Sequence, residues 1–127
     1  MRYVTTLIAL LAVASAIPAV APARDNPGVQ RSGTCAVGTA TWKLKVKNDD
    51  GLLETEFEVD QNRNGRRWNV VLTRNGRVVF RGARVTKPPS GSFELNRRIA
   101  NPAGRDRIVA TARLVGGGGV CRGALTF

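Results

Sequence analysis

The segment from Asp60 to Gly65 has the residue types and spacing that open a calcium-binding loop, D-x-N-x-N-G. Such a loop supplies oxygen ligands from its first, third and fifth positions and a bidentate carboxylate from its twelfth. Here the twelfth position is Val71 and the ninth is Trp68, and nearby arginines repel a divalent cation. A polar turn between two strands, held by asparagine side chains, explains the segment better. The sequence therefore indicates neither a metal site nor a cofactor.

The residues that could support covalent or acid–base catalysis are not arranged as an enzyme needs them. The chain contains no histidine, so the usual base beside a nucleophile is missing. Glu54, Glu56 and Glu58 recur at every second position, which is typical of one solvated strand face and not of an acid and base flanking a sugar bond. The glycines 116–119 lack the lysine and the following helix of a phosphate-binding loop. We therefore expect a protein without catalytic residues.

Basic residues are concentrated in the second half of the chain. Residues 24–60 carry five basic and seven acidic groups, whereas residues 61–127 carry fourteen basic and two acidic groups, and thirteen of those fourteen are arginine. Arginine favours bidentate contacts with phosphate and carboxylate, and a one-sided field attracts anions. We expect the anion-binding residues on the stretch 67–85 and its loops. They are Arg66, Arg67, Arg74, Arg77, Arg81 and Arg84.

This charge favours anionic polymers of the cell envelope as partners. No recognition motif accompanies it, and no exposed aromatic residues interleave with the arginines, so we do not expect a specific nucleic-acid partner. The alternative is that the arginines only keep the protein soluble. A second hypothesis is a protein-binding module, an inhibitor or effector, that uses the loops at 88–91 and 116–119.

The N-terminus has the layout of a secretory signal peptide. Arg2 is followed by an apolar stretch over 4–17 and by small residues at 21–23. We expect cleavage after Ala23 and a protein that is secreted or associated with the cell wall. An uncleaved anchor is the alternative, although two prolines interrupt the stretch. No later stretch is apolar enough to cross a membrane.

Both cysteines lie in the part expected to be exported. Disulfides form in oxidising compartments, so we expect a bond between Cys35 and Cys121. It would close a loop of about 85 residues, to which the chain-entropy model assigns on the order of 4 kcal/mol.

A hairpin is expected over 42–60. Apolar and charged residues alternate on both sides of an Asp-Gly turn at 50–51. A two-residue turn there places Lys47, Lys45 and Lys43 opposite Glu54, Glu56 and Glu58, and Leu44 opposite Phe57 and Trp42 opposite Val59. One face is then charged in opposite-sign pairs and the other is apolar.

A second hairpin is expected over 67–85, with two registers to weigh. A two-residue turn at Asn75-Gly76 would pair Val70 with Arg81 and mix the faces. A three-residue loop over 74–76 pairs Leu72 with Val78, Val70 with Phe80 and Trp68 with Gly82. We favour the second because it keeps large apolar groups on one side.

The remaining alternation predicts strands over 92–99, 107–115 and 120–127, separated by turns at 88–91, 101–104 and 116–119. Residues 24–34 are polar and are expected to be a flexible lead-in. Residues 35–127 then form one all-β domain, an antiparallel immunoglobulin-like β-sandwich of about seven strands, with a small barrel as the alternative. Trp68 and Trp42 are expected in its core.

Several of these segments resemble a group of small exported actinobacterial proteins of unknown function. They are residues 57–65, Trp68, the turn 74–76, residues 89–93, residues 100–104 and the late Cys121. The resemblance covers most of 35–127. It implies a secreted immunoglobulin-like sandwich and brings no activity, ligand or site with it.

Overall fold

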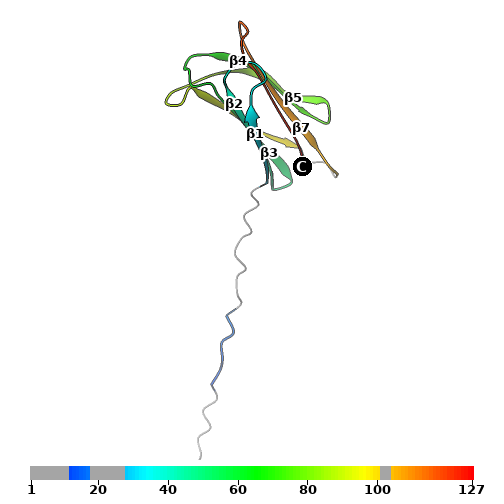
Figure 1. The fold of residues 1–127 in the computed structure, drawn as a ribbon. Helices are drawn as coiled ribbons and strands as arrows, with labels where there is room; N and C mark the ends of the chain where they lie inside the picture. Colours follow the sequence, from blue (N-terminus) through cyan, green and yellow to red (C-terminus); the bar gives the residue numbers. More distant parts are fainter. Residues whose placement is uncertain (1–11, 18–27, 101–103) are drawn as a thin grey trace, which may run out of the picture.

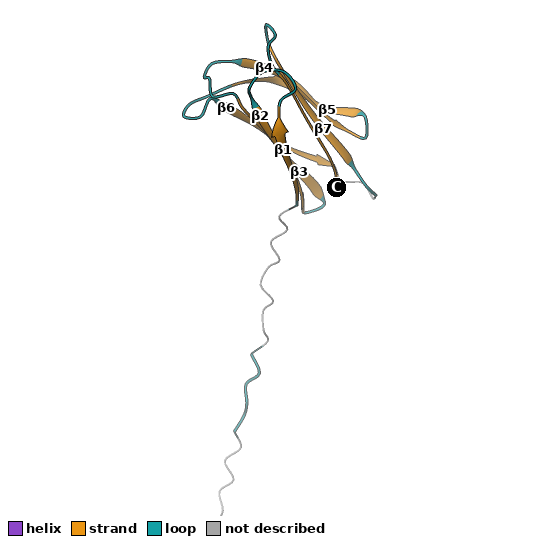
Figure 2. Ribbon diagram, in the orientation of Figure 1, coloured by secondary structure: helices purple, strands orange, loops and turns teal. Residues whose placement is uncertain are grey.

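A computed structural model describes residues 12–17, 28–100 and 104–127, and every regular element in these ranges is a β-strand (Figures 1 and 2). The fold is an antiparallel β-sandwich, as the alternation of apolar and polar residues predicts. The eight strands are β1 (Val29–Thr34), β2 (Thr41–Asp49), β3 (Leu52–Asp60), β4 (Arg67–Arg74), β5 (Arg77–Val85), β6 (Ser92–Ala100), β7 (Arg107–Leu114) and β8 (Val120–Thr126).

The strands form two four-stranded sheets. Sheet A has the order β1-β2-β3-β6, and sheet B has the order β5-β4-β7-β8. The order of sheet B, with Trp68 on β4, is compatible with the predicted immunoglobulin-like subclass, in which a sheet of order C′-C-F-G carries a tryptophan on strand C. Sheet A differs from that pattern, because β3 lies between β2 and β6. The sandwich is therefore shown, and its immunoglobulin-like subclass stays a prediction.

The first hairpin has the predicted register. Lys43, Lys45 and Lys47 pair with Glu58, Glu56 and Glu54, and Leu44 and Trp42 pair with Phe57 and Val59. Asp50 and Gly51 both have positive φ angles, 50° and 80°, as a hairpin turn of the I′ type requires. Sequence patterning was sufficient here because any shift by one residue would have buried the charged row.

The register predicted for the second hairpin is wrong. Its turn has two residues, Asn75 and Gly76, because Arg74 pairs with Arg77. A β-bulge follows at Val79, so that Leu72 pairs with Phe80 and Val70 with Gly82. The bulge inserts one extra residue, which returns the apolar side chains of β5 to the inner face beyond it. Val78, which was expected inside, is consequently 50% exposed.

The expected flexible lead-in is also wrong for residues 29–34. They form β1, which pairs antiparallel with β2 from Val29 opposite Val46 to Thr34 opposite Thr41. Backbone pairing at the edge of an existing sheet needs no apolar side-chain pattern, which is why composition pointed to a loop. This strand raises the count from the expected seven to eight.

The core lies between the sheets and includes one of the two predicted tryptophans, Trp68. Trp68 is fully buried, and its Nε1–H donates to Oε1 of Gln61 at 3.2 Å. Trp42 is half-buried and packs against the core. Cys35 and Cys121 form the predicted disulfide with a Cα–Cα distance of 4.3 Å, and it connects the segment before β2 to β8. The bond therefore joins the two sheets.

Two predictions fall largely outside the described residues. Of the expected signal peptide over 1–23, the structure describes residues 12–17, which have no regular secondary structure. Of the turn expected at 101–104, only Gly104 is described. Within the described ranges, no helix is long and apolar enough to cross a membrane.

Candidate anion-binding surface

The outer face of sheet B carries five exposed arginines, four of which lie close together, while the fifth, Arg107, lies apart at the start of β7. Side chains alternate along each strand, and the buried residues of β4, β7 and β8 and the partly buried Phe80 of β5 point to the core. Arg67 on β4, Arg81 on β5, Arg113 on β7 and Arg122 on β8 consequently point to solvent. We call these four residues the arginine face.

The register places the four arginines in a compact pattern. One row of directly paired residues crosses all four strands, with Arg81 and Arg122 at its two ends and Val71 and Thr111 between them. Arg113 lies in the next row, directly opposite Asn69. Diagonal neighbours on adjacent strands lie about 7–8 Å apart. One diagonal therefore runs from Arg67 through Arg113 to Arg122, and its centre is flanked by small neutral side chains.

No carboxylate lies on this face in the ranges that the structure describes. All but one of the acidic residues in the described ranges belong to β2, β3, β6 or the turn between β2 and β3. The exception is Asp106, which is buried just before β7. None of the ion pairs found among these residues includes a member of the arginine face. The four guanidinium groups consequently form a field of one sign.

Sheet A has the opposite character. Its outer face carries the glutamates of β3 between the lysines of β2 and the polar residues of β6. Lys47 and Glu54 form an ion pair at 3.5 Å, and Arg98 and Asp49 form another at 2.5 Å. Positive and negative groups compensate one another on this sheet, so the charge surplus of the molecule is expressed on sheet B.

A shallow groove crosses the arginine face between β4 and β5. It has a volume of about 390 Å³ and is lined by Arg67, Asn69, Val71, Arg81 and Ala83, among others. The short side chains of Asn69 and Ala83 leave room between the guanidinium groups of Arg67 and Arg81. An extended anionic chain could lie there with charge contacts on both sides.

The six predicted anion-binding arginines do not lie together. Arg67 and Arg81 belong to the arginine face. Arg66 lies outside the sheet, in the loop before β4, and Arg77 is the first residue of β5, at the opposite end of the strand pair. Arg84 points to the inner side of β5, where its guanidinium lies 5.1 Å from the ring centre of Phe80. The six residues therefore do not share one face, and their role in anion binding stays a prediction.

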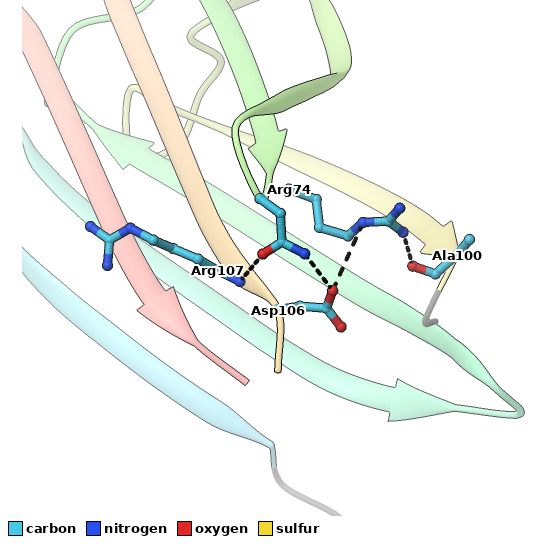
Figure 3. Close-up of polar contacts among 5 residues, drawn as sticks. Arg74, Ala100, Asp106 and Arg107 are labelled. Atoms are coloured by element: carbon cyan, nitrogen blue, oxygen red, sulfur yellow. Dashed lines mark hydrogen bonds and ion pairs between the residues drawn. The ribbon is translucent and has the colours of Figure 1, made fainter. Parts of the chain in front are cut away.

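Arg74 has a structural role. Its Nε lies 3.9 Å from Oδ1 of the buried Asp106, and its guanidinium also donates to the carbonyl oxygen of Ala100 (Figure 3). Asn75 donates to the same Asp106 oxygen at 3.1 Å and accepts from the backbone N–H of Arg107 at 2.8 Å. These contacts engage Arg74 inside the protein, so it is removed from the candidate surface.

Arg113 and Arg122 were missed by sequence reasoning. Alternation with the apolar residues of their strands indicates that both point outward. What the sequence did not contain is the strand order, which places β7 beside β4 and β8 beside β7. Only that order places these arginines next to Arg67.

The Asp60–Gly65 segment has the geometry of a polar turn. Oδ1 of Asp60 accepts the backbone N–H of Asn62 at 3.0 Å, and Asn62 has a φ angle of 56°. This is the local side-chain bond expected of an aspartate at a turn. In the described part of the chain, no three acidic, histidine or cysteine residues gather as metal ligands would.

The fold and the surface together define a disulfide-bridged β-sandwich with one cationic sheet face. Comparison with known proteins found no matching family model, no matching curated protein and no matching solved structure. The resemblance to small exported actinobacterial proteins therefore stays a prediction.

Proposed function

We propose that this protein is an exported, non-enzymatic module that binds anionic polymers of the cell envelope through its arginine face. The observation that carries the proposal is the juxtaposition of four exposed arginines on one sheet face that has no carboxylate among its described residues. Each exposed contact with an anion contributes little by itself. A polymer that meets several of these groups at once gains much more.

The flatness of the site suits a polymer better than a small molecule. A sheet face with a shallow groove offers little enclosure, whereas pockets for small ligands usually bury most of their ligand. Arginine is also well suited to repeated phosphate or carboxylate groups, because its planar fork donates two parallel hydrogen bonds.

Export is part of the proposal. The signal-like N-terminus predicts it, and the Cys35–Cys121 disulfide is compatible with an oxidising compartment outside the cytoplasm. We further propose that the scaffold is a variant of the immunoglobulin-like sandwich with β3 added to sheet A.

Cosedimentation with purified bacterial cell walls tests the proposal. We expect the protein to bind walls that retain their anionic polymers and to be released as salt rises, because the Debye length falls from about 10 Å at 0.1 M to about 3 Å at 1 M. Walls from which the anionic polymers have been stripped should not retain it. Replacing Arg113 and Arg122 by glutamine should weaken binding roughly tenfold or more, at about 1.4 kcal/mol for each tenfold change.

The matched control replaces Arg31 and Arg105 by glutamine. Both are exposed, neither lies on the arginine face, and the loss of net charge is the same. Equal weakening by the two double variants would show that only net charge matters. Retention that salt does not change would contradict the proposal as well.

A second candidate function is a protein-binding module that uses the loops at one end of the sandwich. The structure favours it in one respect, because the loops at 61–66, 86–91 and 116–119 meet at the same end. In a pull-down, this function predicts one defined protein partner whose capture survives 0.5 M salt and the loss of Arg113 and Arg122.

A further inference from the structure

A cavity of about 350 Å³ opens at the end of the sandwich where β7 turns into β8. Its floor includes Trp68 and Leu114, and its walls include Gln61 and the glycines 117–119. Arg63 and Arg66 line it from the loop between β3 and β4, and both are exposed. The cavity is separate from the arginine face and has the size of a pocket for a small ligand.

A buried threonine holds the loop that carries the two arginines. The hydroxyl of Thr86, a residue that is 2% exposed, donates to the carbonyl oxygen of Arg63 at 2.5 Å and accepts the backbone N–H of Arg66 at 2.9 Å. The backbone of Thr86 bonds the same loop twice more, at Gly65 and at Arg66. The positions from which both guanidinium groups extend are therefore set before any ligand arrives, which lowers the entropic cost of binding.

On the opposite wall of the cavity, the backbone of the glycine loop lies close to Trp68 and to Gly38. A Cβ atom on Gly119 would lie 2.6 Å from the indole ring of Trp68, and one on Gly38 would lie 2.6 Å from the carbonyl oxygen of Gly118. Only glycine fits at these contacts. Trp68 also fixes the orientation of Gln61 by donating to its Oε1, which leaves the amide N–H groups of Gln61 as donors beside the cavity.

The chemistry of the lining selects the kind of ligand. Two guanidinium groups favour one anionic group, and none of the lining residues is acidic, so an ammonium group would find no counter-charge. Asp60 lies in an adjoining depression, with one carboxylate oxygen accepting the N–H of Asn62. The Gln61 amide, the Thr39 hydroxyl and the glycine carbonyls suit a ligand whose remaining part is neutral and rich in hydroxyls, because hydroxyls both donate and accept hydrogen bonds.

We propose that this cavity binds an acidic or phosphorylated monosaccharide, with its anionic group between Arg63 and Arg66. The two guanidinium groups bind the charge, and the side chains of Gln61 and Thr39 bind the sugar hydroxyls. The inference is independent of the function proposed for the arginine face, since the two sites share no residue.

Titration of the full protein with matched sugars tests this inference. The probes are glucuronate and glucose 6-phosphate, with neutral glucose, cationic glucosamine and inorganic phosphate for comparison. Two-dimensional NMR follows the indole N–H of Trp68 and the side-chain amide of Gln61, and a Trp42→Phe variant assigns the two indole signals. We expect both anionic sugars to shift these signals and to bind at least about tenfold more tightly than the other three probes.

Substitution then locates the anionic group. Arg63→Gln with Arg66→Gln should weaken binding of the anionic sugars at least about tenfold, since charge-assisted bonds are roughly twice as strong as neutral ones. The loop should keep its structure, because its bonds to Thr86 use backbone atoms of residues 63 and 66. Arg105→Gln, an exposed arginine outside the cavity lining, should leave binding unchanged.

A Thr86→Val variant keeps both charges and removes the hydroxyl that positions them. It should weaken binding severalfold while the arginine face still binds cell walls. The inference is overturned if neither anionic sugar shifts the Trp68 and Gln61 signals, if glucose or inorganic phosphate binds as tightly as glucose 6-phosphate, or if the double arginine variant binds like the unmodified protein.

Discussion

Arg74 on β4 and the buried carboxylate of Asp106, just before β7, form an ion pair at one end of sheet B. Asp106 is 2% exposed, and Nε of Arg74 lies 3.9 Å from its Oδ1. The same guanidinium reaches the carbonyl oxygen of Ala100 at the end of β6, and the backbone of Asp106 exchanges two hydrogen bonds with Phe127. Arg74 and Asp106 together thus connect β4 with the end of β6, the start of β7 and the C-terminal residue.

Asp106→Ala should destabilise the protein by about 2 kcal/mol. The substitution leaves the amide of Asn75 and the guanidinium of Arg74 without their shared acceptor, and losing a partner in a buried polar network costs more than a surface contact is worth. Urea unfolding measures the change. Glu94→Ala removes an exposed carboxylate opposite Glu58 and is the control; it should raise stability by no more than about 0.5 kcal/mol. Equal effects would contradict this account.

Replacing Cys35 and Cys121 together by serine should cost about 2–5 kcal/mol, because the unfolded chain gains freedom over a loop with a sequence separation of 86. The measurement is the urea midpoint of both proteins with and without reductant. Reductant should lower the midpoint of the native protein and leave that of the variant unchanged. Identical midpoints for all four samples would show that the bond contributes nothing to stability.

Gly123→Ala should destabilise the protein by about 1–3 kcal/mol through overpacking. A Cβ atom at residue 123 would lie 2.7 Å from the indole ring of Trp42, which packs across β8 at this point. A double-mutant cycle with Trp42→Leu tests the cause. If the contact is responsible, Gly123→Ala costs clearly less in the Trp42→Leu background, with a coupling above about 0.5 kcal/mol. Additive effects would assign the loss to something else.

Glu94→Lys should stabilise the protein by roughly 0.2–1 kcal/mol. Glu94 on β6 lies directly opposite Glu58 on β3, so the native pair brings two like charges together on an exposed sheet face. Thermal unfolding at low and high salt measures the effect, which should shrink as salt screens the pair. Ser90→Lys adds a positive charge in the loop before β6 and serves as the control. A gain of equal size for both variants would indicate a general charge effect.

The alternation of residue types predicted the strands and their register well where both faces of a strand had a distinct character. The first hairpin is the clearest case, because apolar residues on one face and opposite charges on the other leave one acceptable register. The pattern of the second hairpin did not determine its register. The bulge at Val79 preserves the apolar face, so two registers that differ by two residues satisfy the same pattern.

The candidate sites show the same division. The surplus of arginine in residues 61–127 is visible in the sequence, and so is the outward direction of Arg113 and Arg122. That Arg67 and Arg81 share a face with them could not be predicted, because it depends on β4 lying between β5 and β7. The cavity beside Trp68 also depends on tertiary structure, since Thr86 is 23 residues from Arg63 and bonds its carbonyl.

By itself, the sequence determined an all-β sandwich with a disulfide between its two cysteines and an excess of positive charge. These follow from side-chain alternation, from cysteine count and from composition, which are properties of single strands or of the chain as a whole. Only the tertiary structure decided which arginines are neighbours, which one is engaged by Asp106 and where a cavity opens. The physical reason is that these relationships arise from strand order and from backbone contacts between distant segments, and neither leaves a periodic signature along the chain.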